Sequence, residues 1–237
     1  MSVADQFIRS GMYKNILLVG AEIHSHGLDF STRGRGVSVI FGDGAGAVIL
    51  QPTEEENQGI LTSKLHSDGT FAEKLSVLHP GMHANYHLHR IEGFDEFVVD
   101  FDVDNQPYGG LFINNKIVDE KIYAPYMEGQ AVFKKAVQKF PEVIGEALQE
   151  AGHTPADLDM LIPHQANLRI SQFVQKLLRL PDDKVYNNIM RYGNTTAASI
   201  PIALSEAIQE GKVKRGDLVC TAAFGSGFTW GANLFRY

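Results

Sequence analysis

Short apolar segments alternate along the chain with longer segments of helical character. The apolar segments predict strands at residues 14–22, 37–41, 47–50, 59–66, 158–162, 185–190, 217–223 and 232–237. Helices are expected at residues 2–10, 129–152, 167–178 and 197–211. Strands that alternate with helices of this length are typical of an α/β protein whose sheets are covered by helices.

Two segments interrupt this alternation. Residues 51–57 carry an acidic run and predict a turn or linker between two layers. Residues 71–125 are the least regular part of the chain and contain four closely spaced histidines, His79, His83, His87 and His89. Histidines four apart on a helix could hold zinc, but a Pro-Gly pair interrupts this run and no cysteine joins it. We therefore expect no metal site and favour a surface excursion or a lid over a pocket.

Composition narrows the class of protein. The 237 residues are 44% hydrophobic and 21% charged, which is typical of a soluble globular protein. A formal net charge of −7 argues against a general nucleic-acid-binding protein. No apolar run approaches the roughly 20 residues that cross a bilayer, and residues 1–8 lack the pattern of a signal peptide. The expected location is the cytoplasm, with no membrane partner.

The one cysteine, Cys220, lies within an apolar run that predicts a buried central strand. A cysteine in such a place usually packs as a small hydrophobic residue. Burial without a nearby cation also disfavours the thiolate, so we expect Cys220 to be chemically inert.

Two glycine-rich segments have alternative interpretations. In the first, residues 41–47, Gly42, Gly44 and Gly46 are spaced by two and lead into an apolar strand, unlike the fingerprint of a dinucleotide site. Close backbone packing is the favoured interpretation, and a dinucleotide-dependent oxidoreductase is the weakest functional hypothesis. The second segment, residues 223–231, predicts either a plain hairpin or a turn that aims backbone N–H groups into an aromatic-walled pocket.

Two polar side chains follow predicted strands in the C-terminal part of the chain. His164 belongs to the segment PHQAN and Asn194 to the segment GNTTAAS, and neither has an acidic residue beside it. We expect both side chains to lie at strand ends facing one cleft, where two hydrogen-bond donors could stabilise one developing oxyanion. A structural histidine at the end of a strand is the alternative for His164.

Four segments, which occur along the chain in the order FGDGAGA, HQANLRI, GNTTAASIP and FGSGFTWG, together closely resemble β-ketoacyl-[acyl carrier protein] synthase III, a condensing enzyme of the thiolase superfamily. The resemblance implies a thiolase-like αβαβα architecture with an incomplete N-terminal half. Residues 1–57 would be the remainder of that half. Residues 58–237 would form the C-terminal half, with an irregular insertion at about 71–125.

The same resemblance implies an acyltransferase of fatty-acid biosynthesis. Such an enzyme condenses a primer acyl group from coenzyme A with malonyl-acyl carrier protein, uses no cofactor beyond its thioester substrates and forms a homodimer. Its catalytic set is Cys-His-Asn, in which His164 and Asn194 would donate hydrogen bonds to the enolate oxygen. The nucleophilic cysteine would lie roughly one or two helical turns before Met1, so we expect this chain to be catalytically incomplete alone. A non-catalytic protein that binds acyl-CoA or the carrier is the alternative.

The resemblance also assigns binding residues. The backbone N–H of Ser226 would help to hold the thioester oxyanion. Coenzyme A and its pantetheine arm would contact five residues, Arg35, Gly36, Gly129, Phe133 and Asn167. Three basic residues near one face of the predicted helix at 167–178 would dock the acidic carrier protein, or would simply be solvated: Arg169, Lys176 and Arg179.

Overall fold

A four-stranded sheet forms the centre of the protein in the computed structural model, which describes residues 1–56, 58–77, 119 and 123–237. Its strands lie in the order β3 (Gly59–Ser67), β8 (Thr229–Arg236), β7 (Leu218–Gly225) and β6 (Met160–Pro163). β6 is parallel to β7, whereas β8 is antiparallel to both β7 and β3. The carboxyl ends of β6 and β7 therefore meet at one edge of this sheet.

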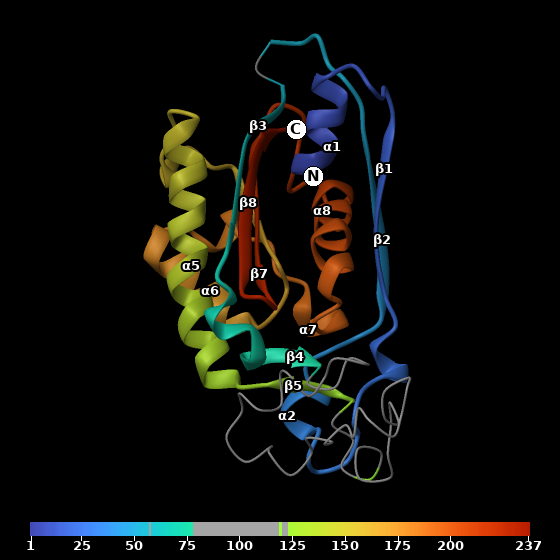
Figure 1. Ribbon diagram of the computed structural model, residues 1–237. Coiled ribbons are helices and arrows are strands. Elements are labelled where there is room, and N and C mark those ends of the chain that lie inside the picture. Colours follow the sequence, from blue (N-terminus) through green and yellow to red (C-terminus); the bar gives the residue numbers. More distant parts are fainter. Residues whose placement is uncertain (57, 78–118, 120–122) are drawn as a thin grey trace.

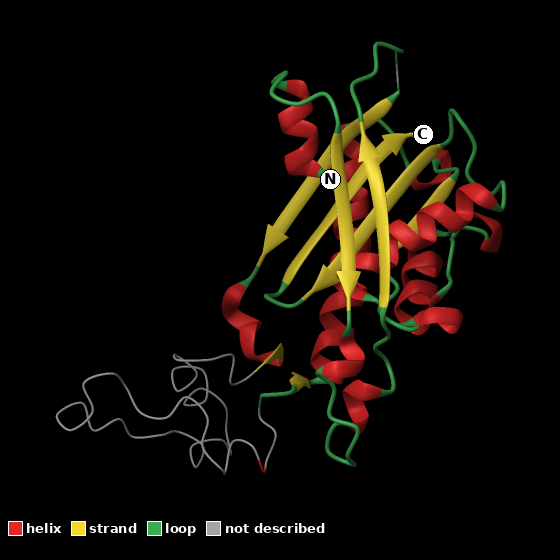
Figure 2. Cartoon of the chain, turned by 90° about the vertical axis from the view of Figure 1, so that its right-hand side faces the viewer, coloured by secondary structure: helices red, strands yellow, loops and turns green. Residues whose placement is uncertain are grey.

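Helices cover both faces of this sheet (Figure 1). α5 (Gly129–Glu150) and α6 (Leu168–Leu178) pack on one face, and α8 (Ser199–Gln209) and α1 (Ser2–Arg9) lie on the other. Beyond α1 and α8 lies an antiparallel ribbon of β1 (Ile16–Glu22) and β2 (Gly44–Leu50). Figure 2 shows the ribbon strands crossing in front of the larger sheet. The described residues thus form an α-β-α-β stack, and the predicted α/β class is confirmed.

Burial on both faces explains the apolar sequence of β7. Leu218, Cys220 and Phe224 belong to the core cluster with α5 and α6, whereas Val219 belongs to the cluster with α8. A strand covered on both faces has a continuous apolar run instead of an alternating pattern. The predicted central strand is confirmed, and burial raises the pKa of the Cys220 thiol to about 12.

Glycines on the inner face of the ribbon allow it to approach α8 closely. A Cβ atom at Gly20 would lie 2.2 Å from the backbone oxygen of Ala197, and one at Gly46 would lie 2.8 Å from Cβ of Pro201. The close packing predicted for alternating glycines is confirmed. The strand predicted at residues 47–50 begins earlier than expected, at Gly44, because Gly44 to Leu50 pair with β1.

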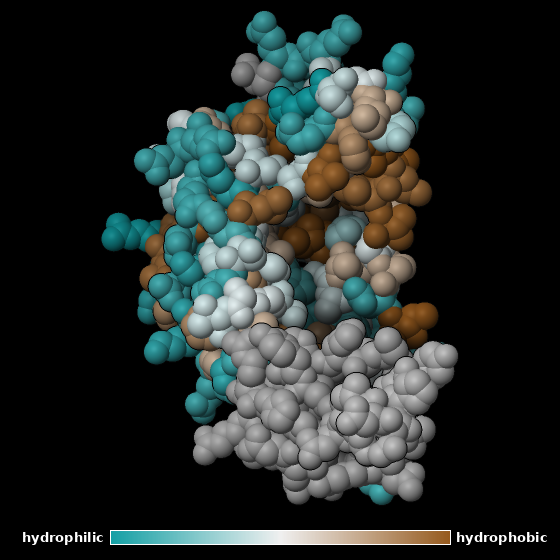
Figure 3. Space-filling model, in the orientation of Figure 1, coloured by the Kyte–Doolittle hydropathy of each residue, from teal (hydrophilic) through white to brown (hydrophobic). Residues whose placement is uncertain are grey.

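The outer face of the ribbon is apolar and exposed. Leu17, Val19 and Ile49 are 62%, 63% and 67% exposed, and Leu17 pairs with Ile49 across the two strands. Figure 3 shows apolar side chains gathered over this part of the molecule.

The strand predicted at residues 37–41 is wrong. Arg35–Ser38 form a short helix, α2, in which the amides of Val37 and Ser38 donate to the Gly34 carbonyl. Only Phe41 makes a sheet-like contact, a single bridge to Asn194. An apolar run this short is compatible with either structure, and here local helical hydrogen bonds replace strand pairing.

The strand predicted at residues 185–190 is also wrong beyond its first residue. Val185 forms one bridge with Leu161, and then Ile189–Tyr192 form the short helix α7. The side-chain oxygen of Gln165 accepts hydrogen bonds from the amides of Asn188 and Ile189 at 2.9 and 3.1 Å. A side chain therefore satisfies backbone groups that a strand would have paired with a neighbour.

The remaining elements are short. β4 (Leu75–Val77) pairs with β5 (Pro125–Met127), which joins the two ends of the predicted insertion. Short 3₁₀ segments occur at His24–His26, Gly69–Lys74, Pro155–Asp157, Asp182–Lys184 and Thr196–Ala198. The four histidines considered for a metal site lie outside the described residues.

Substitution of Gly20 by alanine should destabilise the fold. The added Cβ cannot fit beside the Ala197 carbonyl, so the ribbon must move away from the 3₁₀ turn that precedes α8. We expect a loss of ~1–3 kcal/mol in the free energy of unfolding, measured by urea denaturation. The matched control is Gly145→Ala, because Gly145 lies within α5 facing open space, and alanine there should stabilise by about 0.5–1 kcal/mol. Equal stability of Gly20→Ala and the parent chain would contradict this packing.

Candidate active site

His164 lies directly after β6 and faces a cavity of about 830 Å³. Its backbone amide donates to the Ala222 carbonyl at 2.7 Å, which continues the pairing of β6 with β7. Glu22 from the ribbon, Phe224 from β7 and Ser226 from the following turn also line this cavity. The cavity thus opens where the carboxyl ends of two parallel strands meet, a usual location for ligands in α/β proteins.

The ring of His164 is half-buried and neutral. Its Nδ1 atom lies 2.6 Å from the hydroxyl oxygen of Ser199, the first residue of α8. Burial lowers the pKa of His164 to about 4. One ring nitrogen therefore carries a hydrogen at neutral pH and the other accepts a hydrogen bond.

Asn194 is fixed by its backbone against the segment that precedes β2. Its amide donates to the Ile40 carbonyl at 2.8 Å, and its carbonyl accepts from Gly42 at 3.0 Å. Its side-chain oxygen accepts from the amide of Thr196 at 2.9 Å, which leaves the side-chain nitrogen as the free donor within the described part of the chain. Thr196 lines the cavity of His164, but Asn194 itself does not, so a shared cleft for the two donors stays a prediction.

The second glycine-rich segment forms the hairpin between β7 and β8. Ser226 borders the cavity, and its hydroxyl donates to the Leu75 carbonyl at 2.6 Å. Phe224 lines the cavity, whereas Phe228 is 1% exposed and stacks on Phe71 in the core with ring centroids 5.6 Å apart. The structure thus contains the hairpin, and only one of its two phenylalanines borders the cavity.

The residues predicted to bind coenzyme A lie outside this cavity. Arg35 and Gly36 are exposed on α2, which packs against β5, and Gly129 begins α5 just after β5. Phe133 packs against the core beneath α5, and Asn167 caps α6 by accepting a hydrogen bond from the Arg169 amide at 2.9 Å. Arg35, Gly36 and Gly129 therefore gather near β5, at the end of the molecule where β4 and β5 pair (Figure 1).

The exposed face of α6 is both basic and apolar. Arg169 and Lys176 are exposed on this helix, and Arg179 ends it in a left-handed conformation with φ 55°. Phe173 and Leu177 are 43% and 54% exposed on the same face, since they lie four and eight residues after Arg169. The basic residues were predicted from the sequence, whereas these two apolar residues were not.

Comparison with known proteins identifies the family. Residues 1–69 match the sequence model described as 3-oxoacyl-[acyl-carrier-protein (ACP)] synthase III, and residues 148–237 match that of its C-terminal part. The chain belongs to this family. It is 38% identical over 239 residues to the beta-ketoacyl-[acyl-carrier-protein] synthase III of Caldanaerobacter subterraneus and 40% identical over 235 residues to that of Microcystis aeruginosa. The alignments cover 100% and 99% of this chain, and 62% of each relative.

Solved structures of synthase III support the same assignment. The chain superposes on the enzyme of Aquifex aeolicus with a TM-score of 0.77 at 39% identity, covering 100% of this chain and 62% of that structure. The enzyme of Thermus thermophilus gives a TM-score of 0.77 at 33% identity, covering 100% of this chain and 63% of that structure. The thiolase-like architecture is therefore confirmed, in a chain that spans somewhat less than two thirds of its synthase III relatives.

Glu22 and Ser199 are two polar residues near His164 that the sequence analysis missed. Glu22 ends β1, lines the cavity and accepts a weak hydrogen bond from the Ala197 amide at 3.4 Å. Its position at the end of a predicted strand was the signal that could have found it. In the described ranges, no three His, Cys, Asp or Glu side chains are grouped to hold a metal ion. No helix in these ranges is long and apolar enough to cross a membrane.

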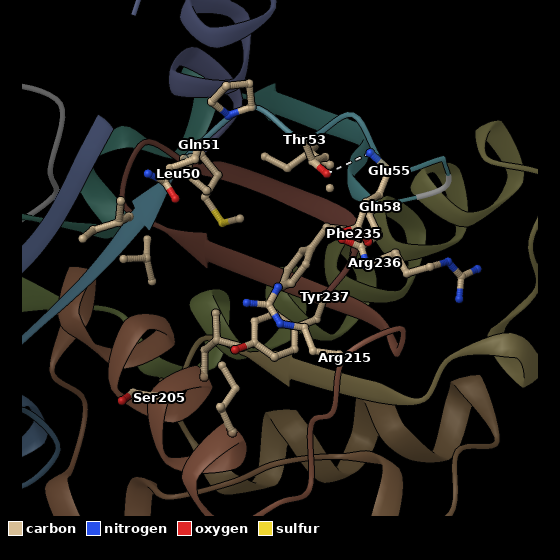
Figure 4. A pocket seen from close by; sticks show the side chains of 18 of the residues that line it. Leu50, Gln51, Thr53, Glu55, Gln58, Ser205, Arg215, Phe235, Arg236 and Tyr237 are labelled. Atoms are coloured by element: carbon tan, nitrogen blue, oxygen red, sulfur yellow. Dashed lines mark hydrogen bonds between the residues drawn. The ribbon is translucent and has the colours of Figure 1, made fainter. Parts of the chain in front are cut away.

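A second cavity of about 820 Å³ lies away from His164 (Figure 4). It separates the end of β2, at Leu50, from Ser205 on α8 and Phe235 on β8. Arg215 at its edge lies over the ring of Tyr237, 4.5 Å from the centroid. Neither predicted donor lines this space, so the cavity of His164 is the candidate active site.

His164 should remain uncharged down to mildly acidic pH. The folded pKa of about 4 lies below the ordinary 6.5, so the unfolded chain binds the extra proton first. The contribution of neutral His164 to stability is therefore complete above pH 6.5 and is lost as the pH falls toward 4. We expect an NMR titration to show His164 titrating below pH 5. We also expect a smaller loss of stability between pH 6.5 and 4 in His164→Gln than in the parent chain. Titration of His164 near pH 6.5 would contradict its burial.

Proposed function

We propose that this chain belongs to an enzyme that condenses a primer acyl-CoA with malonyl-acyl carrier protein in fatty-acid biosynthesis. The observation that carries the proposal is a neutral histidine at the carboxyl end of β6, facing a cavity, in a chain of the synthase III family. The relatives that match the whole chain bear the name of that activity.

Stabilisation of the enolate formed in this reaction requires hydrogen-bond donors that keep their protons. When the malonyl thioester loses carbon dioxide, the bonding electrons move to the thioester and give an enolate, whose oxygen carries the new charge. Nε2–H of His164 and Nδ2–H of Asn194 are the proposed donors to that oxygen. The enolate carbon then attacks the primer thioester, and the primer's sulfur leaves as a thiolate. Each such donor typically contributes about 10²–10³ in rate.

The acyl-enzyme half of this reaction needs a thiolate nucleophile. Cys220 is the one cysteine of the sequence, is 0% exposed and has its pKa raised to about 12, so it does not fit that role. We propose that this chain alone performs only the decarboxylation step. The alternative is a non-catalytic protein that binds acyl-CoA or the carrier, and it differs by releasing no carbon dioxide.

The proposed substrate path runs from the cavity toward β5. The backbone N–H of Ser226 would support the thioester oxyanion at the cavity, and a coenzyme A arm would pass four other residues near the surface, Arg35, Gly36, Gly129 and Asn167. Phe133 would contribute indirectly, because its side chain packs against the core and holds α5 in place. We further propose a cytoplasmic homodimer that pairs through β1, whose second edge has no partner strand among the described residues.

Decarboxylation of malonyl-CoA by the purified chain is the direct test of the proposed donors. We expect slow release of carbon dioxide, and a fall of about 10²–10³ in rate for both His164→Ala and Asn194→Ala. The control is His153→Ala, because His153 lies after α5 and does not line the cavity. Equal rates for His164→Ala and the parent chain would refute the catalytic role. Binding of malonyl-CoA without carbon dioxide release would instead favour the non-catalytic alternative.

Binding of the acyl carrier protein tests the face of α6. Carrier proteins are acidic, so reversing the charge of Arg169 or Lys176 should weaken binding by about tenfold or more, mostly at low salt. Lys214→Glu is the charge-matched control, because Lys214 is exposed in the loop before β7. Titration calorimetry at two salt concentrations measures both effects. Equal weakening by all three substitutions would indicate general attraction between opposite charges and no specific docking face.

A further inference from the structure

We propose that Ser199 is the positioning residue that holds the neutral ring of His164 with its hydrogen on Nε2, facing the candidate active site. The catalytic role of this hydrogen rests on the proposed function. The tautomer itself is a property of the free protein. Ser199 acts through His164 and does not line the cavity.

The contacts of the Ser199 hydroxyl define which way its hydrogen points. Ser199 is 2% exposed, and its Oγ lies 2.6 Å from Nδ1 of His164. The backbone amide of Gln165 donates to the same oxygen at 3.4 Å. Since an amide can only donate, that contact occupies Oγ as an acceptor and leaves its hydrogen for Nδ1.

The opposite tautomer leaves a buried hydroxyl hydrogen without a partner. If Nδ1 of His164 carried the hydrogen, Oγ of Ser199 would accept from both the ring and the Gln165 amide. Its own hydrogen would then have no acceptor among the described residues. A buried unsatisfied donor is costly enough to disfavour that tautomer by about tenfold or more.

Other contacts keep the His164 backbone from moving away from Ser199. The Gln165 side chain donates to the Pro163 carbonyl at 2.7 Å while accepting from the amides of Asn188 and Ile189. The His164 amide is bonded to Ala222 on β7. The segment 163–165 is therefore tied to β7 on one side and to the start of α7 on the other, and the position of Nδ1 follows from it.

The chemical identity of the partner also matters. A carboxylate bonded to Nδ1 would stabilise the charged imidazolium. The neutral ring would then accept a proton more readily at Nε2, as in hydrolytic triads. The Ser199 hydroxyl fixes the same ring nitrogen without adding charge. This arrangement suits a histidine that donates a hydrogen bond to an enolate and keeps its proton.

Nitrogen NMR of the ¹⁵N-histidine-labelled chain at pH 7 measures the tautomer directly. We expect Nε2 of His164 to show the ¹⁵N chemical shift of a protonated ring nitrogen. The His164 signal is assigned by its absence in His164→Gln. Ser199→Ala should move the tautomer ratio about tenfold toward Nδ1–H, whereas Ser199→Thr should preserve it because the hydroxyl remains. Ser205→Ala is the control, since Ser205 is an exposed serine of the same helix.

Two results would overturn the proposal: a hydrogen on Nδ1 in the parent chain, or an unchanged tautomer in Ser199→Ala. Should Ser199→Ala fail to fold, Ser199→Cys retains the shape with a weaker donor and gives the same comparison. In the decarboxylation assay, Ser199→Ala should lower kcat about tenfold with KM unchanged, and Ser199→Thr should restore it. Because the NMR experiment uses no substrate, an inactive chain would refute the proposed function and leave the tautomer result intact.

Discussion

β7 is covered by helices on both faces, and this double burial determines where the candidate site lies. Its odd and even positions enter two different core clusters, so neither face can turn toward solvent without exposing apolar surface. β6 pairs beside it in parallel, and the core under α5 and α6 includes side chains from both strands. His164, the first residue after β6, is thereby brought to the edge where the cavity opens.

The polar groups of the proposed site come from three parts of the chain. His164 follows β6, Ser199 begins α8, and the loop before α8 carries Asn194, the second proposed donor, whose side-chain oxygen accepts a hydrogen bond from Thr196. Each group is held by neutral hydrogen bonds. A site that stabilises a developing anion gains from donors that are oriented in advance, because the protein need not reorganise as the charge appears. Within the described residues, the His164 ring bonds to a hydroxyl and to no carboxylate, which is consistent with that chemistry.

The sequence predicted the long elements and missed the local exceptions. Helices at 129–152 and 167–178 were predictable from their length, and the beginning of the second was marked by the Asn167 cap. The strand predictions at 37–41 and 185–190 were wrong because a short apolar run does not distinguish a strand from a helical turn. In the second case the deciding partner, Gln165, lies about twenty residues away in sequence. Ser199 was missed for a similar reason: at the start of a helix a serine suggests a cap, and only the packing of α8 against β6 reveals its contact with His164.

The glycines of the ribbon have a consequence for how its two strands align. Inner positions of β1 and β2 alternate with outer ones, so a slip of one residue would turn Val19 or Ala21 toward the Ala197 carbonyl in place of Gly20. A side chain at that position would clash with the Ala197 carbonyl, so a shift of β1 by one residue is sterically disfavoured. The backbone of the 3₁₀ turn Thr196–Ala198, just before α8, therefore favours the alignment that places Gly20 opposite it. Only that alignment delivers the Glu22 carboxylate to the rim of the cavity.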